Sequence, residues 1–148
     1  MEAKTKFWFD CKVKYGKTQE DGVVKVVKEE YLVDAMSFAE AEARITKEME
    51  SFISGEFDVA TVKKNGSVEL FKSENADANK YYQAKVSFIA IDEKTGAERK
   101  TAESVYIHAV DFDDALFTLK NNMRDTMSDW EISALVETAI LDAYEYND

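Results

Sequence analysis

The sequence has 148 residues, of which 45% are hydrophobic, so it is long enough to bury the core of one ordinary domain. Its 30 acidic and 19 basic residues give a net charge of −11, which repels nucleic-acid phosphate at long range without excluding a local basic strip. The single cysteine, Cys11, excludes an internal disulfide, and no segment has the apolar length of a signal peptide or membrane span. We therefore expect a cytoplasmic protein with no membrane partner.

The first predicted element is a strand that begins near Phe7, because hydrophobic and polar residues alternate there with a period of two. One face carries Phe7, Phe9, Cys11, Val13 and Tyr15, and the other carries Trp8, Asp10, Lys12 and Lys14. A turn over residues 19–22 ends in glycine, which predicts a hairpin to a returning strand that closes at Ala35.

A helix is expected next, because Ser37 and Glu40 have the spacing of a capping box. Its apolar face comprises Phe38, Ala41, Ile45 and Met49. A strand over residues 57–62 follows, and then Asn65-Gly66, a dipeptide typical of a type I′ hairpin turn. That turn predicts that a short strand over residues 68–71 pairs back onto the strand before it.

The second half repeats this order at an offset of about 74 residues. A strand over residues 82–88, a turn ending at Gly96 and a returning strand ending at Ala109 match the first hairpin. Asp111 and Asp114 copy the helix cap more weakly. The matching helix face comprises Phe112, Ala115, Leu119 and Met123, a stripe that is typical of a packed core.

Residues 130–145 fit two interpretations. Ile132, Val136 and Ala139 also recur at helical spacing, and Ser128 with Glu131 could cap a helix. The duplication instead predicts two strands, by analogy with residues 57–71. We adopt the two strands.

The predicted architecture is therefore α+β, a tandem duplication of a strand–strand–helix–strand–strand unit with one helix on an antiparallel sheet in each half. The repeats span about residues 6–72 and 80–146, related by a pseudo-twofold axis. The connection is short and polar, so residues 1–148 are expected to form a single compact domain. The two halves could share one continuous sheet or form two sheets packed face to face.

Five segments of this sequence carry a resemblance to a known family: Phe9–Val13, Tyr31–Phe38, Glu40–Arg44, Ile53–Phe57 and Asp92–Ala97. Through these segments the chain resembles the domain of unknown function 4494, found in bacteria and their phages. The resemblance covers nearly the whole chain. It implies a small cytoplasmic or phage-encoded protein with no assigned activity, and it brings no functional residues with it.

The residues give no support for catalysis. Cys11 and His108 fall on opposite faces of their strands, one apolar and one polar, so a Cys–His dyad is not expected. No zinc-ligand spacing, calcium-binding loop or phosphate-binding glycine motif occurs. Asp111, Asp113 and Asp114 cluster at a helix start, where the helix dipole already favours acids. We expect no enzyme activity, no metal and no cofactor.

One surface is a candidate for nucleic-acid or partner binding. Trp8, Lys12 and Lys14 lie on the polar face of the first strand, and Tyr81 and Lys85 repeat the pattern in the second half. An exposed aromatic beside a lysine is the composition of a platform for single-stranded nucleic acid. The alternative is that Trp8 and Tyr81 are buried at an interface between the halves or between subunits, because large aromatic residues are rarely left uncovered.

The leading hypothesis is a non-enzymatic interaction module that binds an unknown protein partner or a second copy of itself. Single-stranded nucleic-acid binding through Trp8 and Tyr81 is an alternative, which the net charge disfavours. A third hypothesis is an acidic protein that mimics DNA or inhibits a host protein, motivated by the charge of −11.

Overall fold

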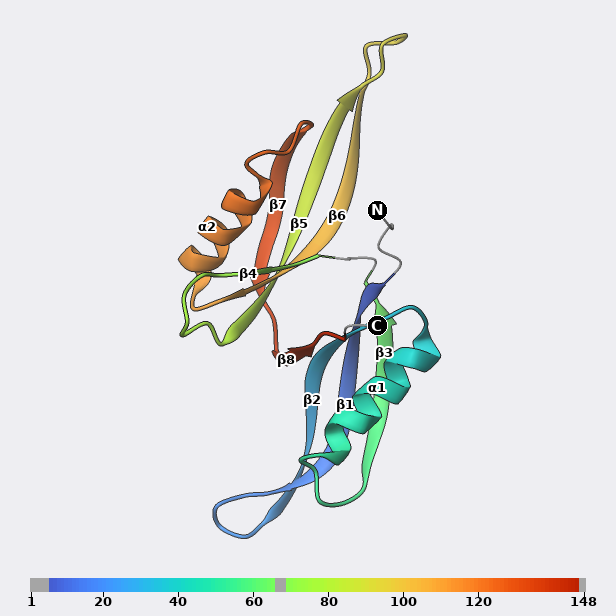
Figure 1. The fold of residues 1–148 in the computed structure, drawn as a ribbon, viewed down its shortest axis with the longest axis vertical. Coiled ribbons are helices and arrows are strands. Elements are labelled where there is room, and N and C mark those ends of the chain that lie inside the picture. The colour runs from blue at the N-terminus through green and yellow to red at the C-terminus, as the bar shows by residue number, and fades with distance from the viewer. Residues whose placement is uncertain (1–5, 66–68, 147–148) are drawn as a thin grey trace. The chain divides into compact units, whose positions relative to one another are not determined.

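The computed structural model describes residues 6–65 and 69–146, which divide into two compact units. Unit 1 takes its described residues from 6–65 and 139–146, and unit 2 takes its residues from 69–138. Each unit is a four-stranded sheet with one helix on one face (Figure 1). The α+β class and the repeated strand–strand–helix–strand–strand order are both confirmed. The two halves therefore form two separate sheets and not one continuous sheet.

Unit 1 is built on a long hairpin. Its strands are β1 (Phe7–Thr18), β2 (Val24–Ala35), β3 (Phe57–Lys64) and β8 (Ile140–Tyr144), in the order β3-β1-β2-β8, and its helix is α1 (Phe38–Glu50). The first three strands pair antiparallel, whereas β8 pairs parallel with β2. The expected turn residue between β1 and β2 is Gly22, whose φ of 82° is a left-handed conformation that glycine adopts without strain.

Unit 2 has the same plan. Its strands are β4 (Leu70–Lys72), β5 (Lys80–Ile91), β6 (Glu98–Ala109) and β7 (Asp129–Glu137), in the order β4-β6-β5-β7, and its helix is α2 (Phe112–Met123). The central pairings are antiparallel, and β4 pairs parallel with β6. Residues 130–145 form β7 and β8, so the two strands predicted from the duplication are confirmed and the helix is not formed.

The two repeats exchange their last strands. β4 follows β3 in the chain but pairs with β6 of the second repeat, and β8 follows β7 but pairs with β2 of the first repeat. The predicted hairpin between β3 and β4 is therefore wrong, and the fourth strand of each sheet is parallel. The local turn preference of Asn65-Gly66 is overridden because β4 completes a sheet edge elsewhere; Gly66 itself lies outside the described residues. For the same reason the units do not coincide with repeats 6–72 and 80–146.

The core of each unit lies between the helix and the facing side of the sheet, which we call the helix face; the opposite side is the far face. In unit 1 the buried residues include Phe9, Cys11, Val33, Ile45 and Met49, as the period-two and helical patterns predicted. In unit 2 the matching core residues are Tyr82, Ala84, Val86, Ile107, Ala115 and Leu119. Burial of these apolar side chains stabilises each unit.

The predicted helix caps are present in both units. Ser37 Oγ accepts a hydrogen bond of 3.1 Å from the Glu40 amide, and Glu40 Oε1 accepts one of 3.2 Å from the Met36 amide. Asp111 Oδ1 accepts a bond of 2.8 Å from the Asp114 amide in the same way. These side chains satisfy amides that the helix itself leaves unpaired, so they fix where α1 and α2 begin.

The segment after β8 is anchored to unit 1 by polar contacts. The Tyr146 amide donates a 2.9 Å hydrogen bond to Asp34 Oδ1, and the Tyr146 hydroxyl donates to a Glu48 carboxylate oxygen. The Arg44 guanidinium lies 4.4 Å from the centroid of the Tyr146 ring and 3.3 Å from Asp34 Oδ1. These contacts hold the chain beside β2 and α1 once β8 has joined the sheet.

Because β8 pairs with β2, a destabilising substitution in β8 is expected to affect unit 1. Ile140→Ala, at a side chain that is 5% exposed, is expected to lower the free energy of unfolding by about 2 kcal/mol in urea denaturation. Amide hydrogen exchange should accelerate at residues 30–33 of β2, the partner of β8, and not in β7. Leu141→Ala, at a 53% exposed neighbour, is the matched control and should change stability by less than about 0.5 kcal/mol. Faster exchange in β7 instead of β2 would contradict the exchange of strands.

Candidate functional site

The two aromatic residues of the predicted platform are buried. Trp8 on β1 is 4% exposed and Tyr81 on β5 is 5% exposed. The Tyr81 ring stacks on the ring of His108 in the neighbouring strand, with centroids 4.4 Å apart. Neither ring is presented at the surface for a nucleic-acid base.

The three lysines of the platform are divided between the units. Lys12 and Lys14 lie on the far face of β1 in unit 1, where Lys12 is half-buried and Lys14 is exposed. Lys85 lies at the corresponding place on β5 in unit 2 and is exposed. Within unit 1, Lys12 stands directly opposite Glu30 and Lys14 directly opposite Lys28. The cationic character of this face therefore increases from Lys12 toward the outer part of the hairpin.

A carboxyl pair that the sequence analysis did not single out lies on the same far face. Asp10 interacts with Glu30, and its Oδ1 atom is buried without a hydrogen-bond partner among the described residues. Burial, with the hydrogen bond and the negative charge of Glu30, raises the pKa of Asp10 to about 7, although Lys12 and Lys63 oppose this. The Asp10 carboxyl group therefore still holds a proton in part of the molecules near neutral pH. The sequence showed two acids on neighbouring strands but not their proximity.

Another carboxylate is enclosed by hydroxyl groups on the helix face. Glu29 Oε1 accepts hydrogen bonds of 2.6 Å from the Tyr15 hydroxyl and 3.1 Å from the Tyr31 hydroxyl, and Glu29 Oε2 lies 3.5 Å from Lys17 Nζ. Burial and Glu29 together raise the pKa of Tyr15 to about 12, so the hydroxyl stays protonated and keeps donating. This cluster stands at the point where the hairpin leaves the part of unit 1 covered by the helix.

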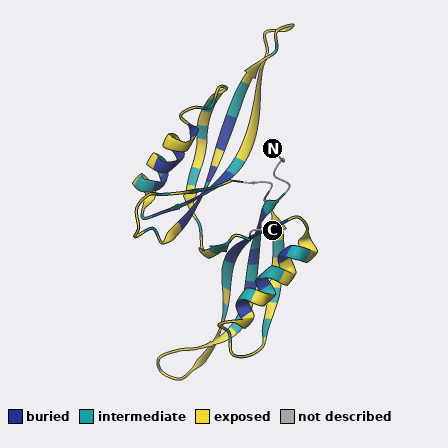
Figure 2. Cartoon of the chain, in the orientation of Figure 1, coloured by how far each residue is buried: buried dark blue, intermediate teal, exposed yellow. Residues whose placement is uncertain are grey.

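We call residues 14–28 the first arm. At its base Lys14 and Tyr15 still pair with Asp58 and Phe57 of β3, and beyond them the hairpin is two-stranded, with neither face covered by another described element. Its valines Val23, Val24 and Val26 are 59%, 63% and 62% exposed, and Figure 2 shows the hairpin ends exposed. The alternating pattern did not reveal this, because alternation predicts which face a side chain joins and not whether anything covers that face. The signal in the sequence was the number of lysines around these valines.

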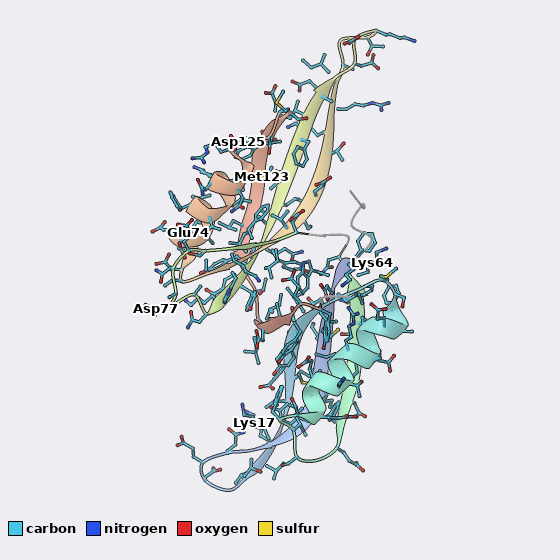
Figure 3. The ribbon with its side chains drawn as sticks, viewed as in Figure 1. Lys17, Lys64, Glu74, Asp77, Met123 and Asp125 are labelled. Atoms are coloured by element: carbon cyan, nitrogen blue, oxygen red, sulfur yellow. The ribbon has the colours of Figure 1, made fainter. Side chains whose placement is uncertain are left out.

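The arm carries pairs of lysines on opposite strands. Lys14 faces Lys28 across the far face, and Lys17 faces Lys25 across the helix face. Lys17, labelled in Figure 3, lies on the outer part of β1. The strand segments of the arm, residues 14–18 and 24–28, hold four lysines and no acid, and the two acids of the arm, Glu20 and Asp21, are in the turn. Like charges directly opposite one another destabilise an isolated hairpin.

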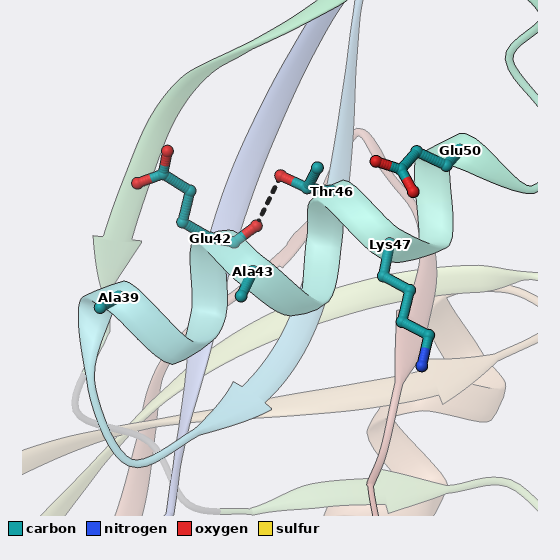
Figure 4. Close-up of a pocket in the computed structure, with 6 residues that line it drawn as sticks. All are labelled: Ala39, Glu42, Ala43, Thr46, Lys47 and Glu50. Carbon is teal, nitrogen blue, oxygen red and sulfur yellow. Dashed lines mark hydrogen bonds between the residues drawn. The ribbon is translucent and has the colours of Figure 1, made fainter.

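The surface also has hollows beside the two helices. A hollow on the outer side of α1 is lined by Ala39, Glu42, Ala43, Thr46, Lys47 and Glu50 (Figure 4). The Thr46 hydroxyl in this hollow already donates a 2.7 Å hydrogen bond to the Glu42 backbone carbonyl. In unit 2 a polar cavity of about 210 Å³ lies between the segment after β4 and α2, and Asn75, Asn121 and Asn122 contribute to its lining. In it the Asn122 amide already donates 2.7 Å to the Thr118 carbonyl.

The cysteine has the surroundings of a packing residue. Cys11 is fully buried in the core of unit 1, and burial, followed by the charge of Asp10, raises the pKa of its thiol to about 12. A thiol with that pKa is protonated at neutral pH and is a poor nucleophile. Among the described residues no three His, Cys, Asp or Glu side chains gather in a metal-binding group, and no helix is long and apolar enough to cross a membrane.

The sequence of residues 7–146 matches the family described as Domain of unknown function (DUF4494). The chain belongs to this family. Its match includes every described helix and strand of both units, so the duplicated fold with exchanged strands is the fold of this DUF4494 member. A comparison with curated proteins finds no match. The description of the DUF4494 family names no activity, and any function must therefore be argued from the surfaces described above.

The Asp10–Glu30 pair predicts a pH-dependent stability for this DUF4494 member. Because the pKa of Asp10 is raised from 3.8 in the unfolded chain to about 7, the folded state holds a proton more tightly, and stability falls as the pH rises between these values. Asp10→Asn supplies a neutral amide that can donate to Glu30. We expect it to raise the free energy of unfolding at pH 8 by roughly 1–3 kcal/mol and to change little at pH 4.

The measurement is urea denaturation at pH 4, 6 and 8. Asp58→Asn, at an exposed acid on β3, is the control and should leave the pH profile unchanged. An Asp10→Asn profile that runs parallel to that of the unchanged protein would show that this pair is not the source of the pH dependence.

Proposed function

We propose that this chain is a non-enzymatic cytoplasmic binding module that contacts its partner through the first arm, residues 14–28. The observation that carries the proposal is the exposure of Val23, Val24 and Val26 on a hairpin that no described element covers on either face. Scattered exposed apolar residues need no explanation, but a group of them surrounded by lysines is typical of an interaction surface.

Two features of the arm, a glycine beside the valines and a hydrogen-bonded cluster at its base, support a role for these valines in binding. Gly16 lies directly opposite Val26, and a Cβ atom at Gly16 would come within 2.9 Å of Val24 Cγ1. The absence of a side chain there lets Val24 lie close to the β1 backbone. The Tyr15–Glu29–Tyr31 cluster fixes the base of the arm, so the exposed part extends from a rigid support.

The buried titratable groups support a binding role over a catalytic one. Cys11 is a protonated core thiol, the His108 ring is stacked on Tyr81, and the Glu29 carboxylate is occupied by two tyrosine hydroxyls and a lysine. Each of these groups stabilises its own unit. None of them is combined with an exposed cavity in which a substrate would meet a nucleophile and a base.

Site-specific photo-crosslinking tests the proposal. A photoreactive amino acid is placed at Val24 in the arm, or at Ala43, which is exposed on the outer side of α1, as the control. Both variants are irradiated in bacterial lysate, and adducts are resolved by gel and mass spectrometry. We expect discrete adducts at Val24 that are absent at Ala43. No adduct at Val24, or the same adducts at both positions, would contradict the arm as the contact site.

A further inference from the structure

We infer that the first arm binds in the groove of a nucleic-acid duplex. The inference rests on the proposed function, because it names the partner of the same arm. Its basis is one juxtaposition: a hairpin with opposed lysine pairs on both faces, two-stranded beyond Tyr15, and exposed valines next to one of those pairs.

The charge of the arm is the reverse of that of the chain. The chain has a net charge of −11, whereas the first arm, residues 14–28, contains four lysines against two acids. Lys14, Lys25 and Lys28 are exposed and have no ion pair among the described residues, whereas Lys17 is paired with Glu29 at 3.5 Å and Lys14 stands opposite Asp58 of β3 on its other side. The arm is therefore a local cationic element on an anionic body. Such an element is complementary to a polyanion.

The placement of the lysines distinguishes between polyanions. A flat acidic protein surface can meet only one face of a ribbon, so the lysine pair on the other face would stay in water. A duplex groove has a phosphate backbone along each wall, and a ribbon inserted in it meets phosphate on both sides. The pair Lys14 and Lys28 and the pair Lys17 and Lys25 occupy opposite faces, as that geometry requires. The major groove of B-form DNA is about 12 Å wide and accepts a two-stranded β-ribbon.

The valines fit the same position. Val24 and Val26 belong to the far face, the one that carries Lys14 and Lys28, and Thr18 stands directly opposite Val24. Lysines nearer the base of the arm would meet phosphates while these small apolar side chains reach base edges. Apolar side chains contact the methyl group of thymine in the major groove. The acidic remainder of the protein keeps the sheets away from the backbone, so that only the arm approaches the duplex.

The second hairpin provides an internal comparison. Its outer part, residues 89–100, contains Lys94, Arg99 and Lys100 against Asp92, Glu93 and Glu98, so it has no net charge. Lys100 Nζ lies 3.0 Å from Glu131 Oε1, which neutralises it within its own unit. Ile89 faces Lys100 and Ile91 faces Glu98, so no two lysines stand opposite one another there. The inference applies to the first arm alone.

Fluorescence anisotropy with a labelled 20-base-pair DNA duplex tests the inference. We expect the full chain to bind at 50 mM salt and to lose roughly 100-fold in affinity at 200 mM, as for about four phosphate contacts. The variant Lys14→Gln with Lys28→Gln and the variant Lys17→Gln with Lys25→Gln should each weaken binding at least about tenfold. Lys85→Gln with Lys94→Gln removes the same charge from unit 2 and should change affinity less than about twofold. Urea denaturation confirms that all variants are folded.

Four results would overturn the inference. Loss of binding with only one of the two arm variants would indicate contact with a single face rather than a groove. Tighter binding of the matching single strand would exclude a duplex partner. No duplex binding at 50 mM salt, together with protein adducts at the Val24 photo-crosslinker, would show that the arm binds a protein, so that the proposed function stands and the duplex does not. Failure of both experiments would remove both proposals.

Discussion

The parallel pairing of β8 with β2 and of β4 with β6 is the constraint on which the rest of the structure depends. Neither repeat forms the fourth strand of its own sheet, so each unit needs a segment from the other repeat to cover an edge of its central hairpin. An uncovered edge would leave a row of unpaired amide and carbonyl groups beside β2 or β6. The exchange is reciprocal: the first repeat supplies β4 to the sheet of unit 2, and the second repeat supplies β8 to the sheet of unit 1. Each sheet is therefore complete only when both repeats are present.

Within each unit the helix is shorter than the hairpin and covers only part of it. The covered part of the hairpin packs in the core, and the uncovered part is exposed. The inner parts of β1 and β2 contribute Phe9, Cys11 and Val33 to the core, whereas the valines of the first arm lie beyond the helix. The hydroxyl groups of Tyr15 and Tyr31 close this boundary around Glu29. The units share this plan but differ in charge, because only the first arm carries lysines opposite lysines. A duplicated frame has thus acquired one distinctive surface.

Much of the fold could be predicted from the sequence because its signals were local and present twice. The alternation around Phe9, the cap formed by Ser37 and Glu40, and the repeat in residues 129–144 each predicted the element that the structure contains. The partner of β4 could not be predicted, because the turn preference of Asn65-Gly66 is local whereas strand pairing depends on residues far away in the chain. The burial of Trp8 could be stated only as one of two alternatives for a related reason, since alternation assigns a face and not its environment. The arm was missed because its lysines were counted singly and not as cross-strand pairs.

The exchange also sets an order for synthesis on the ribosome. Unit 2 is continuous, so all of its strands have been made once residue 137 has been added, whereas unit 1 begins at β1 and lacks β8 until residues 140–144 have followed. The unit whose synthesis begins first is therefore the one that is finished last. Because domains generally fold as units during synthesis, from the N-terminus onward, this chain reverses the usual sequence of events. While the second half is being made, the edge of β2 that β8 will cover stays open, and a nascent chain is then most exposed to pairing with a neighbour.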